Sequence, residues 1–199
     1  MKYSLTLFAT IALAASSLPL TAAELPALDR VRALAEPKAI ADAALEDQYG
    51  REAHLADLRG KVAFVLFGFT NCPDVCPVAM ERLRELHDSG KLANGDVHYV
   101  MISIDGERDT PAAMRAFLAK YSEGFVGLTA APDAVRPVAE SFSVAFFKGA
   151  HTRHDGGYDV AHSPQIFVLD PTGALRAELY GASLDSMVTL AEALLAETR

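Results

Sequence analysis

The chain has 199 residues, of which 51% are hydrophobic and 22% are charged, and its formal net charge is −8 at pH 7. This length and composition predict one globular α/β domain and exclude a disordered or fibrous chain. The acidic balance argues against nucleic acid as a partner, because a phosphate backbone requires a basic surface.

The N-terminal segment has the pattern of an export signal. Lys2 precedes an apolar run over residues 3–20, and the small residues 21–23 follow it. Pro19 interrupts the run, which is short for a membrane-spanning helix of ~20 residues. We therefore predict a signal peptide over 1–23, with an uncleaved anchor as the alternative. The protein is then periplasmic, either free or anchored to the inner membrane by this segment alone.

The rest of the chain is predicted to be a linker over 24–38 followed by one domain over 39–199. Hydrophobic periodicity and turn residues divide this domain into alternating strands and helices. The elements expected in chain order are a hairpin over 45–54, a helical turn over 55–58, a strand over 62–69, a helix over 77–89, a strand over 97–105, a helix over 110–121, a strand over 125–129, a helix over 133–142, the start of a strand over 144–147, a polar loop over 149–158, a hairpin over 165–180 and a helix capped by Ser183.

This order of elements predicts an α/β fold of the thioredoxin-like type, with an extra N-terminal β-hairpin. The central sheet is mixed, and helices flank both of its faces. The run over 62–69 is apolar throughout, as is typical of a central strand covered on both sides. Pro77 suits the first position of a helix, and Thr110, Asp133 and Ser183 are expected N-caps.

The chain has two cysteines, and Cys72 and Cys76 follow the predicted central strand at a strand-to-helix turn. Side chains four residues apart on a helix lie ~5–6 Å from each other on one face. The two sulfurs can therefore close a disulfide or clamp one soft cation, and a nearby helix N-terminus favours the thiolate in both cases. A purely structural disulfide is disfavoured, because so short a loop removes little chain entropy.

Two thiolates prefer Cu(I), or Zn(II) with more ligands, and an imidazole is the expected third ligand. His162 is the strongest candidate, because it stands just before the predicted strand at 165–170. In a thioredoxin-like sheet this loop faces the cysteine turn. The other histidines are expected at surface or structural positions, with weak metal binding open for the two in the polar loop: His54, His87, His98, His151 and His154.

Three separated motifs resemble the signature of the Sco/SenC family of copper chaperones. They are VLFGFTNCPDVCP at 65–77, SIDGERDTP at 103–111, and His162-Ser163 ahead of FVLDPTG at 167–173. The resemblance runs from about residue 40 to the C-terminus. It implies a thioredoxin-like domain that binds one copper, as Cu(I) or Cu(II), per monomer through Cys72, Cys76 and His162.

The resemblance further implies delivery of copper to the binuclear site of the apo cytochrome c oxidase copper-binding subunit, or to another cuproprotein. A periplasmic copper donor and a thioredoxin-like reductant are the implied further partners. We expect a metallochaperone rather than a classical enzyme. The main alternative is a thiol–disulfide oxidoreductase in which Cys72 and Cys76 are the redox-active pair and reduce the cysteines of a copper-site apo-protein. A thiol peroxidase and a copper or redox sensor are weaker alternatives.

The chain departs from the family pattern at two positions. Ala161 stands where many relatives have an aspartate before the metal histidine, and Asp159 is the residue that could substitute for it. Gly106 stands where relatives often have proline. We interpret Asp105 and Asp109, which flank this second position, as structural caps, with copper tuning or partner docking as the alternative.

Overall fold

A computed structural model describes residues 25–152, 158–161 and 165–198. Within these residues, eight strands form one mixed sheet in the order β1-β10-β9-β4-β5-β6-β2-β3, and β7 pairs with β8 separately. The strands are β1 Val31–Lys38, β2 Leu45–Asp47, β3 Glu52–Ala53, β4 Val62–Gly68, β5 Val97–Ser103, β6 Val126–Thr129, β7 Phe147–Thr152, β8 Tyr158–Ala161, β9 Ile166–Leu169 and β10 Leu175–Leu179. The helices are η1 Leu55–Leu58, α1 Val75–Asp88, α2 Pro111–Leu118, α3 Pro132–Ser141 and α4 Leu184–Ala196.

β4 lies at the centre of the sheet. It pairs in parallel with β5 and antiparallel with β9, and all of its residues are buried. A strand covered on both faces is apolar at every position rather than at alternate positions. The prediction of a central strand from the continuous apolar run is therefore confirmed.

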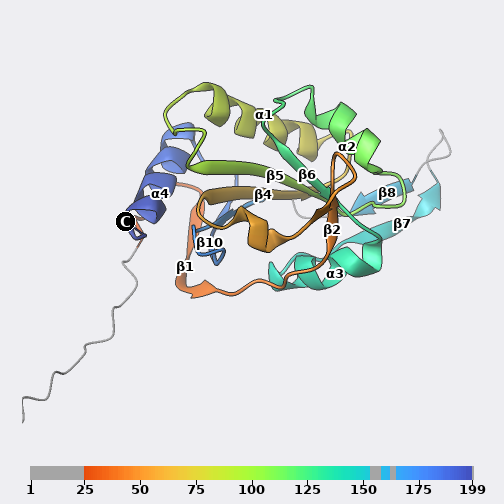
Figure 1. Cartoon of the computed structure of the whole chain (residues 1–199), viewed down its shortest axis with the longest axis horizontal. Coiled ribbons are helices and arrows are strands. Elements are labelled where there is room, and N and C mark those ends of the chain that lie inside the picture. Colours follow the sequence, from red (N-terminus) through yellow and green to blue (C-terminus); the bar gives the residue numbers. More distant parts are fainter. Residues whose placement is uncertain (1–24, 153–157, 162–164, 199) are drawn as a thin grey trace, which may run out of the picture.

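Helices cover both faces of the sheet, with α1 and α2 on the opposite side from α3 (Figure 1). α1, α2 and α4 pack against the face to which Phe64 and Leu66 of β4 contribute. α3 and η1 pack against the other face, with Val65 and Phe67 of the same strand. The alternation of β4 side chains between two hydrophobic clusters holds the end of this strand rigidly in place.

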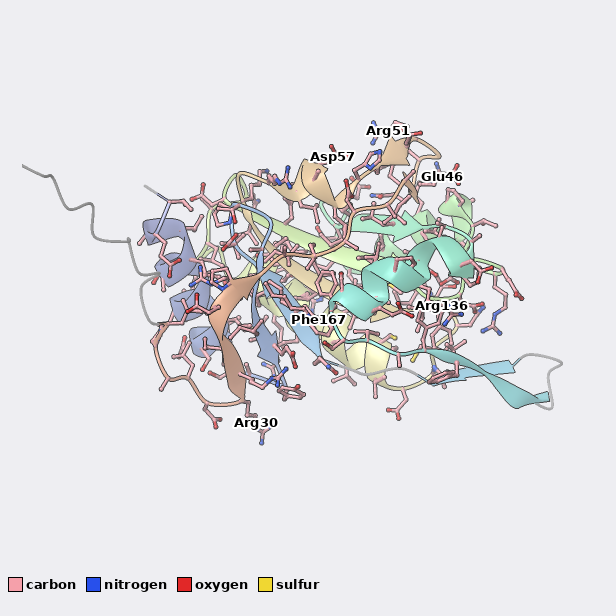
Figure 2. All side chains as sticks on the ribbon, turned by 90° about the horizontal axis from the view of Figure 1, so that it is seen from below. Arg30, Glu46, Arg51, Asp57, Arg136 and Phe167 are labelled. Atoms are coloured by element: carbon pink, nitrogen blue, oxygen red, sulfur yellow. The ribbon has the colours of Figure 1, made fainter. Side chains whose placement is uncertain are left out.

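The second cluster is built around three aromatic rings. Phe67, Phe142 and Phe167 pack edge to face, with ring centroids 5.0, 5.8 and 5.2 Å apart. Figure 2 shows Phe167 in the interior, whereas the labelled charged side chains such as Arg30 and Arg51 lie at the periphery. Cys72 and Cys76 belong to the same cluster, so the thiol pair rests on the core and not on a loose loop.

The helix after the cysteines starts earlier than predicted. α1 begins at Val75, so Cys76 lies in its first turn and Pro77 comes after it. Pro77 is still tolerated, because the N–H groups of a first helical turn have no acceptor inside the helix. Ala79, Leu83 and Leu86 of α1 are buried, as the periodicity predicted.

The predicted caps are correct at two helices and wrong at one. The Thr110 and Ser183 side chains accept hydrogen bonds from backbone N–H groups at the start of α2 and α4. Asp133 does not cap α3, because that helix already begins at Pro132 and Asp133 lies in its first turn. A carboxylate there still interacts favourably with the helix dipole.

Among the helices of the described residues, none has the length and apolar character to cross a membrane.

The end of the predicted linker is a strand in the structure. β1 pairs antiparallel with β10 at the edge of the sheet. Along β1, Val31 and Leu34 are half-buried and the other side chains are exposed, so the apolar alternation that would reveal a strand is missing. The backbone pairing comes from the partner strand, which the local sequence does not show. The predicted signal peptide over 1–23 lies outside the described residues.

The predicted polar loop over 149–158 is also wrong in its described part. Residues 147–152 form β7 and residues 158–161 form β8, and the two strands pair antiparallel. This two-stranded sheet stands apart from the central sheet. Glycine and histidine in this segment predict turns. The two strands pair with each other and not with the central sheet, so no continuous apolar pattern marks them in the sequence.

Candidate metal centre

The structure brings Cys72 and Cys76 together as free thiols. Cys72 lies in the turn between β4 and α1 and is 7% exposed, and Cys76 lies in the first turn of α1 and is fully buried. The backbone N–H of Cys72 donates to the Phe69 carbonyl at 3.1 Å. The Cys76 thiol is hydrogen-bonded to the Cys72 side chain and to the backbone of Phe69. One tight turn therefore fixes both sulfurs.

Burial dominates the electrostatics of this pair. Desolvation raises the pKa of Cys76 far above that of a free thiol, and the hydrogen bond with the Phe69 backbone opposes this only in part. The expectation that the helix N-terminus would favour the thiolate is therefore wrong for Cys76 in the metal-free protein. A soft cation that binds here displaces a proton, since the thiolate is the ligand.

Gly68, the last residue of β4, provides the space for the Cys76 sulfur. A Cβ atom at this position would lie 2.8 Å from the Cys76 Sγ and 3.3 Å from the Met101 Cε. Real Cβ atoms do not approach other atoms so closely, so any larger residue here would push the sulfur aside. This glycine belongs to the sequence motif that contains the cysteines. The need for a glycine at this position follows from the packing of Cys76 and Met101 against it.

The β5–α2 loop holds the cysteine turn through the Asp109 side chain. Its Oδ2 atom accepts hydrogen bonds from the Thr70 N–H at 3.0 Å and from the Ser103 hydroxyl at 2.7 Å. Its Oδ1 atom accepts from the Thr70 hydroxyl at 2.6 Å. We call these contacts of Thr70, Ser103 and Asp109 the Asp109 brace. The interpretation of Asp109 as a helix cap is wrong, because Thr110 caps α2.

A second contact from the same loop reaches the turn. The Arg108 guanidinium lies over the Phe69 ring, 5.8 Å from its centroid. The Arg108 Nε atom also donates to the Asp105 carboxylate at 2.5 Å. Asp105 therefore orients Arg108 and does not cap a helix. Gly106 is required here, because a Cβ at this position would lie 1.8 Å from the Ala130 carbonyl oxygen.

None of the histidines whose side chains are described joins the thiols. His54 pairs with Asp42 and Glu52 near the N-terminal hairpin. His87 packs against the rings of Tyr99 and Phe125. Burial lowers the pKa of His98 on β5. Among the described residues, no group of three histidine, cysteine, aspartate or glutamate side chains is arranged to hold a metal ion.

The remaining candidate ligands lie outside the described residues or in the two-stranded sheet of β7 and β8. His162 and His154 lie outside the described residues, as do Ser163 and Pro164. His151 lies in β7 and Asp159 in β8. The third ligand predicted for the thiol pair therefore stays a prediction.

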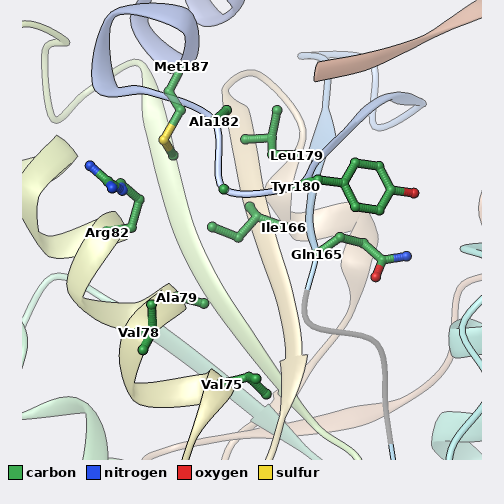
Figure 3. A pocket seen from close by; sticks show the side chains of 11 residues that line it. Val75, Val78, Ala79, Arg82, Gln165, Ile166, Leu179, Tyr180, Ala182 and Met187 are labelled. Atoms are coloured by element: carbon green, nitrogen blue, oxygen red, sulfur yellow. The ribbon is translucent and has the colours of Figure 1, made fainter. Parts of the chain in front are cut away.

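The described residues on both sides of His162 share a hydrophobic cluster with the cysteines or a cavity with Val75, the neighbour of Cys76. Val160 is buried in the hydrophobic cluster that contains Cys72 and Cys76. Gln165 and Val75, the neighbour of Cys76, line one cavity of about 330 Å³ (Figure 3). β9 is antiparallel to β4. The start of β9 therefore lies beside the C-terminal end of β4, from which the chain continues to Cys72.

The same cavity has a mostly apolar lining that includes Val75, the neighbour of Cys76. Its walls come from α1 on one side and from the end of β10 and the start of α4 on the other (Figure 3). Val78 and Tyr180 line it and are 70% and 49% exposed. Arg82 adds one charged side chain to the lining. The surface next to Val75 is thus mostly hydrophobic.

Comparison with known proteins gives one consistent result. The family model described as SCO1/SenC matches residues 33–195. The SCO2-like protein RC0895 of Rickettsia conorii is 30% identical over 139 residues, which cover 70% of this chain and 68% of that protein. The solved structure of Bradyrhizobium japonicum ScoI with copper bound is 32% identical, with a TM-score of 0.66, and the match covers 80% of this chain and 98% of that one.

Yeast Sco1 with copper bound gives a similar result. It is 28% identical with a TM-score of 0.69, and the match covers 76% of this chain and 85% of that one. These likenesses extend over most of the described domain, so they concern its whole architecture and not the cysteine motif alone. The thioredoxin-like fold expected from the order of elements is confirmed.

Proposed function

Because this chain belongs to the SCO1/SenC family, we propose that it is a copper chaperone that carries one copper ion between Cys72, Cys76 and His162. The observation that carries the proposal is the buried pair of free thiols fixed by one turn. Two thiolates with an imidazole are soft ligands that suit Cu(I). The solved structures of the Bradyrhizobium and yeast relatives, which have copper bound, support copper as the ion.

The neighbours of His162 support its place in the ligand set. One residue separates it from Val160, which packs in the same cluster as both cysteines, and two separate it from Gln165, which shares a cavity with Val75. An extended chain spans at most ~3.3–3.6 Å per residue. This short tether to residues that pack with the cysteines or with their neighbour Val75 supports His162 as the third ligand, whereas His54 pairs with Asp42 and Glu52.

We propose that copper leaves by ligand exchange. Thiolates of the recipient replace Cys72 and Cys76 one at a time, and Cys72, the less buried of the two, is the first to be replaced. The recipient is the apo copper-binding subunit of cytochrome c oxidase or a related cuproprotein, as the family resemblance implies. The hydrophobic surface beside the thiols, with Val78 and Tyr180, suits a protein recipient rather than a small molecule.

The second candidate function is reduction of a recipient's disulfide by Cys72 and Cys76. The adjacent free thiols favour it. The raised pKa of Cys76 does not, because a thiol that stays protonated at neutral pH is a poor nucleophile. Metal binding overcomes this barrier, since the ion itself stabilises the thiolate. We therefore place copper transfer first.

Titration of Cu(I) against a chromogenic Cu(I) chelator tests the ligand set. In the reduced protein, His162→Ala should weaken Cu(I) binding at least about tenfold, the effect of losing one good ligand interaction. Disulfide exchange with glutathione should stay close to that of the wild type. His54→Ala is the matched control, because His54 pairs with Asp42 and Glu52 near the N-terminal hairpin. Equal Cu(I) affinity of His162→Ala and wild type would show that the proposed site is wrong.

Export completes the proposal. The segment 1–23 has the charge and apolar pattern of a signal peptide, and an exported compartment is one in which thiols oxidise unless a reductant or a metal protects them. N-terminal sequencing of the protein from the periplasmic and membrane fractions distinguishes cleavage after residue 23 from an uncleaved anchor. Recovery of the protein only from the cytoplasm would contradict this part of the proposal.

A further inference from the structure

Asp109 has a buried carboxylate that is not part of the proposed ligand set. It is fully buried, and desolvation raises its pKa even though the Thr70 and Ser103 hydrogen bonds lower it. Desolvation of a buried carboxylate is unfavourable unless its hydrogen bonds compensate for it. Its side-chain oxygens accept three hydrogen bonds, two from Thr70 and one from Ser103.

Thr70 is the part of the cysteine turn that these bonds fix. It lies between Phe69, whose carbonyl accepts from the Cys72 N–H at 3.1 Å, and Cys72 itself. The Asp109 N–H donates in turn to the Asp105 carbonyl of the same loop at 2.9 Å. The turn that carries Cys72 is therefore tied through Asp109 to Ser103 at the end of β5.

The two states of the thiol pair place different demands on this turn. A disulfide brings the sulfurs to about 2.05 Å. Metal–thiolate bonds of about 2.3 Å keep two sulfurs on one ion about 4 Å apart. In the structure Cys72 and Cys76 are both free thiols, and the Asp109 brace is formed in this state. The fixed turn thus corresponds to the open, metal-ready arrangement.

We propose that Asp109 is a positioning residue that acts through Thr70 to hold the cysteine turn open, so that the thiol pair favours copper over its own disulfide. The Cu(I)-binding test of this inference rests on the proposed function, whereas the glutathione test is independent of it. Loss of the brace lets Cys72 move towards Cys76. Disulfide formation then becomes easier and Cu(I) binding weaker.

The redox step is an exchange with a low-molecular-weight disulfide. The two protein thiols lose two electrons and two protons and form one S–S bond. Glutathione disulfide takes up both electrons and both protons, its S–S bond breaks, and two glutathione thiols are released. The ratio of reduced to oxidised protein in glutathione buffers therefore measures how strongly the turn resists closure.

Two identical substitutions separate positioning from general stability. Thr70→Val removes the hydroxyl that donates to the Asp109 carboxylate, whereas Thr129→Val removes a hydroxyl that donates to the Asp109 backbone carbonyl. Thr70→Ser keeps the hydroxyl and is the conservative rescue. Asp109→Ala removes the whole brace.

We expect Thr70→Val to weaken Cu(I) binding by about three- to tenfold and to shift the glutathione equilibrium towards the disulfide by a similar factor, as for one hydrogen bond to a charged group. A tenfold shift is about 30 mV in midpoint potential. Thr129→Val and Thr70→Ser should stay within about twofold of wild type in both readouts, and Asp109→Ala should exceed Thr70→Val. If Asp109→Ala does not fold, the two Thr→Val variants decide the question.

The outcomes distinguish this inference from the proposed function. If wild type binds Cu(I) but Thr70→Val matches Thr129→Val in both readouts, the positioning role is wrong and the proposed function stands. If wild type binds no Cu(I), the proposed function fails. The glutathione equilibrium still tests Asp109 in that case, and an unchanged midpoint in Thr70→Val overturns the positioning role.

Discussion

The Cα atom of Gly68 faces the sulfur of Cys76 so closely that a single added methyl group would lie 2.8 Å from it. The end of the central strand and the first turn of α1 therefore meet at the Cys76 sulfur with no space left between them. Because β4 is buried along its whole length, it cannot yield to a larger side chain. The position of the Cys76 sulfur is thus set by the packing of the strand as much as by the turn.

Gly68→Ala should weaken Cu(I) binding and destabilise the protein. Overpacking a tight core site costs about 1–3 kcal/mol, and here the atom displaced is a proposed ligand. Urea unfolding and Cu(I) titration of the reduced protein measure the two effects. Gly95→Ala is the matched control, because a Cβ at Gly95 meets nothing within 4 Å. Unchanged copper affinity in Gly68→Ala would show that the sulfur position does not limit binding.

The stability of the reduced, metal-free protein should fall as the pH rises above about 9. The pKa of Cys76 is raised by burial above its ordinary value of 9.0, so in this range the unfolded chain releases a proton that the folded protein retains. The unfolded state therefore binds fewer protons and gains relative stability, with a slope of up to ~1.4 kcal/mol per pH unit.

Urea unfolding between pH 8 and pH 10 in the presence of a reductant measures this slope. Burial raises the pKa of Tyr99 from its ordinary value of 10.0 to about 12, so its contribution begins near pH 10, at the upper end of this range. Cys76→Ser, which does not titrate, is the control and should show a smaller slope than wild type. Equal slopes in the two proteins would mean that the Cys76 thiol is not desolvated in solution.

Cu(I) should stabilise the reduced protein against heat. An ion that binds the folded state alone contributes about 2.7 kcal/mol at a free concentration of 100 times its Kd. For a domain of this size the melting temperature then rises by about 5–10 °C. Differential scanning calorimetry with buffered Cu(I) measures the shift. Cys72→Ser should lose most of it, and an unchanged shift in that variant would remove Cys72 from the ligand set.

The buried Arg176 should be important for stability and irrelevant to copper. Its guanidinium pairs with Asp170 at 3.2 Å and with Glu197 at the end of α4. Arg176→Ala leaves two carboxylates without their cation, a loss of about 3–5 kcal/mol for a buried pair. Arg82→Ala, which breaks an exposed pair with Glu85, should change stability by about 0.5 kcal/mol or less. Urea unfolding compares the two, and equal losses would contradict the role of burial.

Much of the fold could be predicted because its strongest signals are local. The apolar run of β4, the helix cap at Thr110 and the turn glycines at Gly60 and Gly173, which have positive φ angles, each depend on neighbouring residues. The pairing of β1 with β10 and of β7 with β8 could not be predicted. These edge strands lack apolar alternation, and a strand of that kind is defined by its partner's backbone.

The candidate site divides in the same way. The sequence by itself determined the thiol pair at a strand-to-helix turn, the family and the thioredoxin-like order of elements, because spacing along the chain carries that information. Only the tertiary structure decided that Cys76 is desolvated, that Gly68 makes room for its sulfur and that Asp109 ties down the turn before Cys72. These features depend on contacts between segments distant in sequence, and burial in a packed core reverses the electrostatics expected from the helix alone.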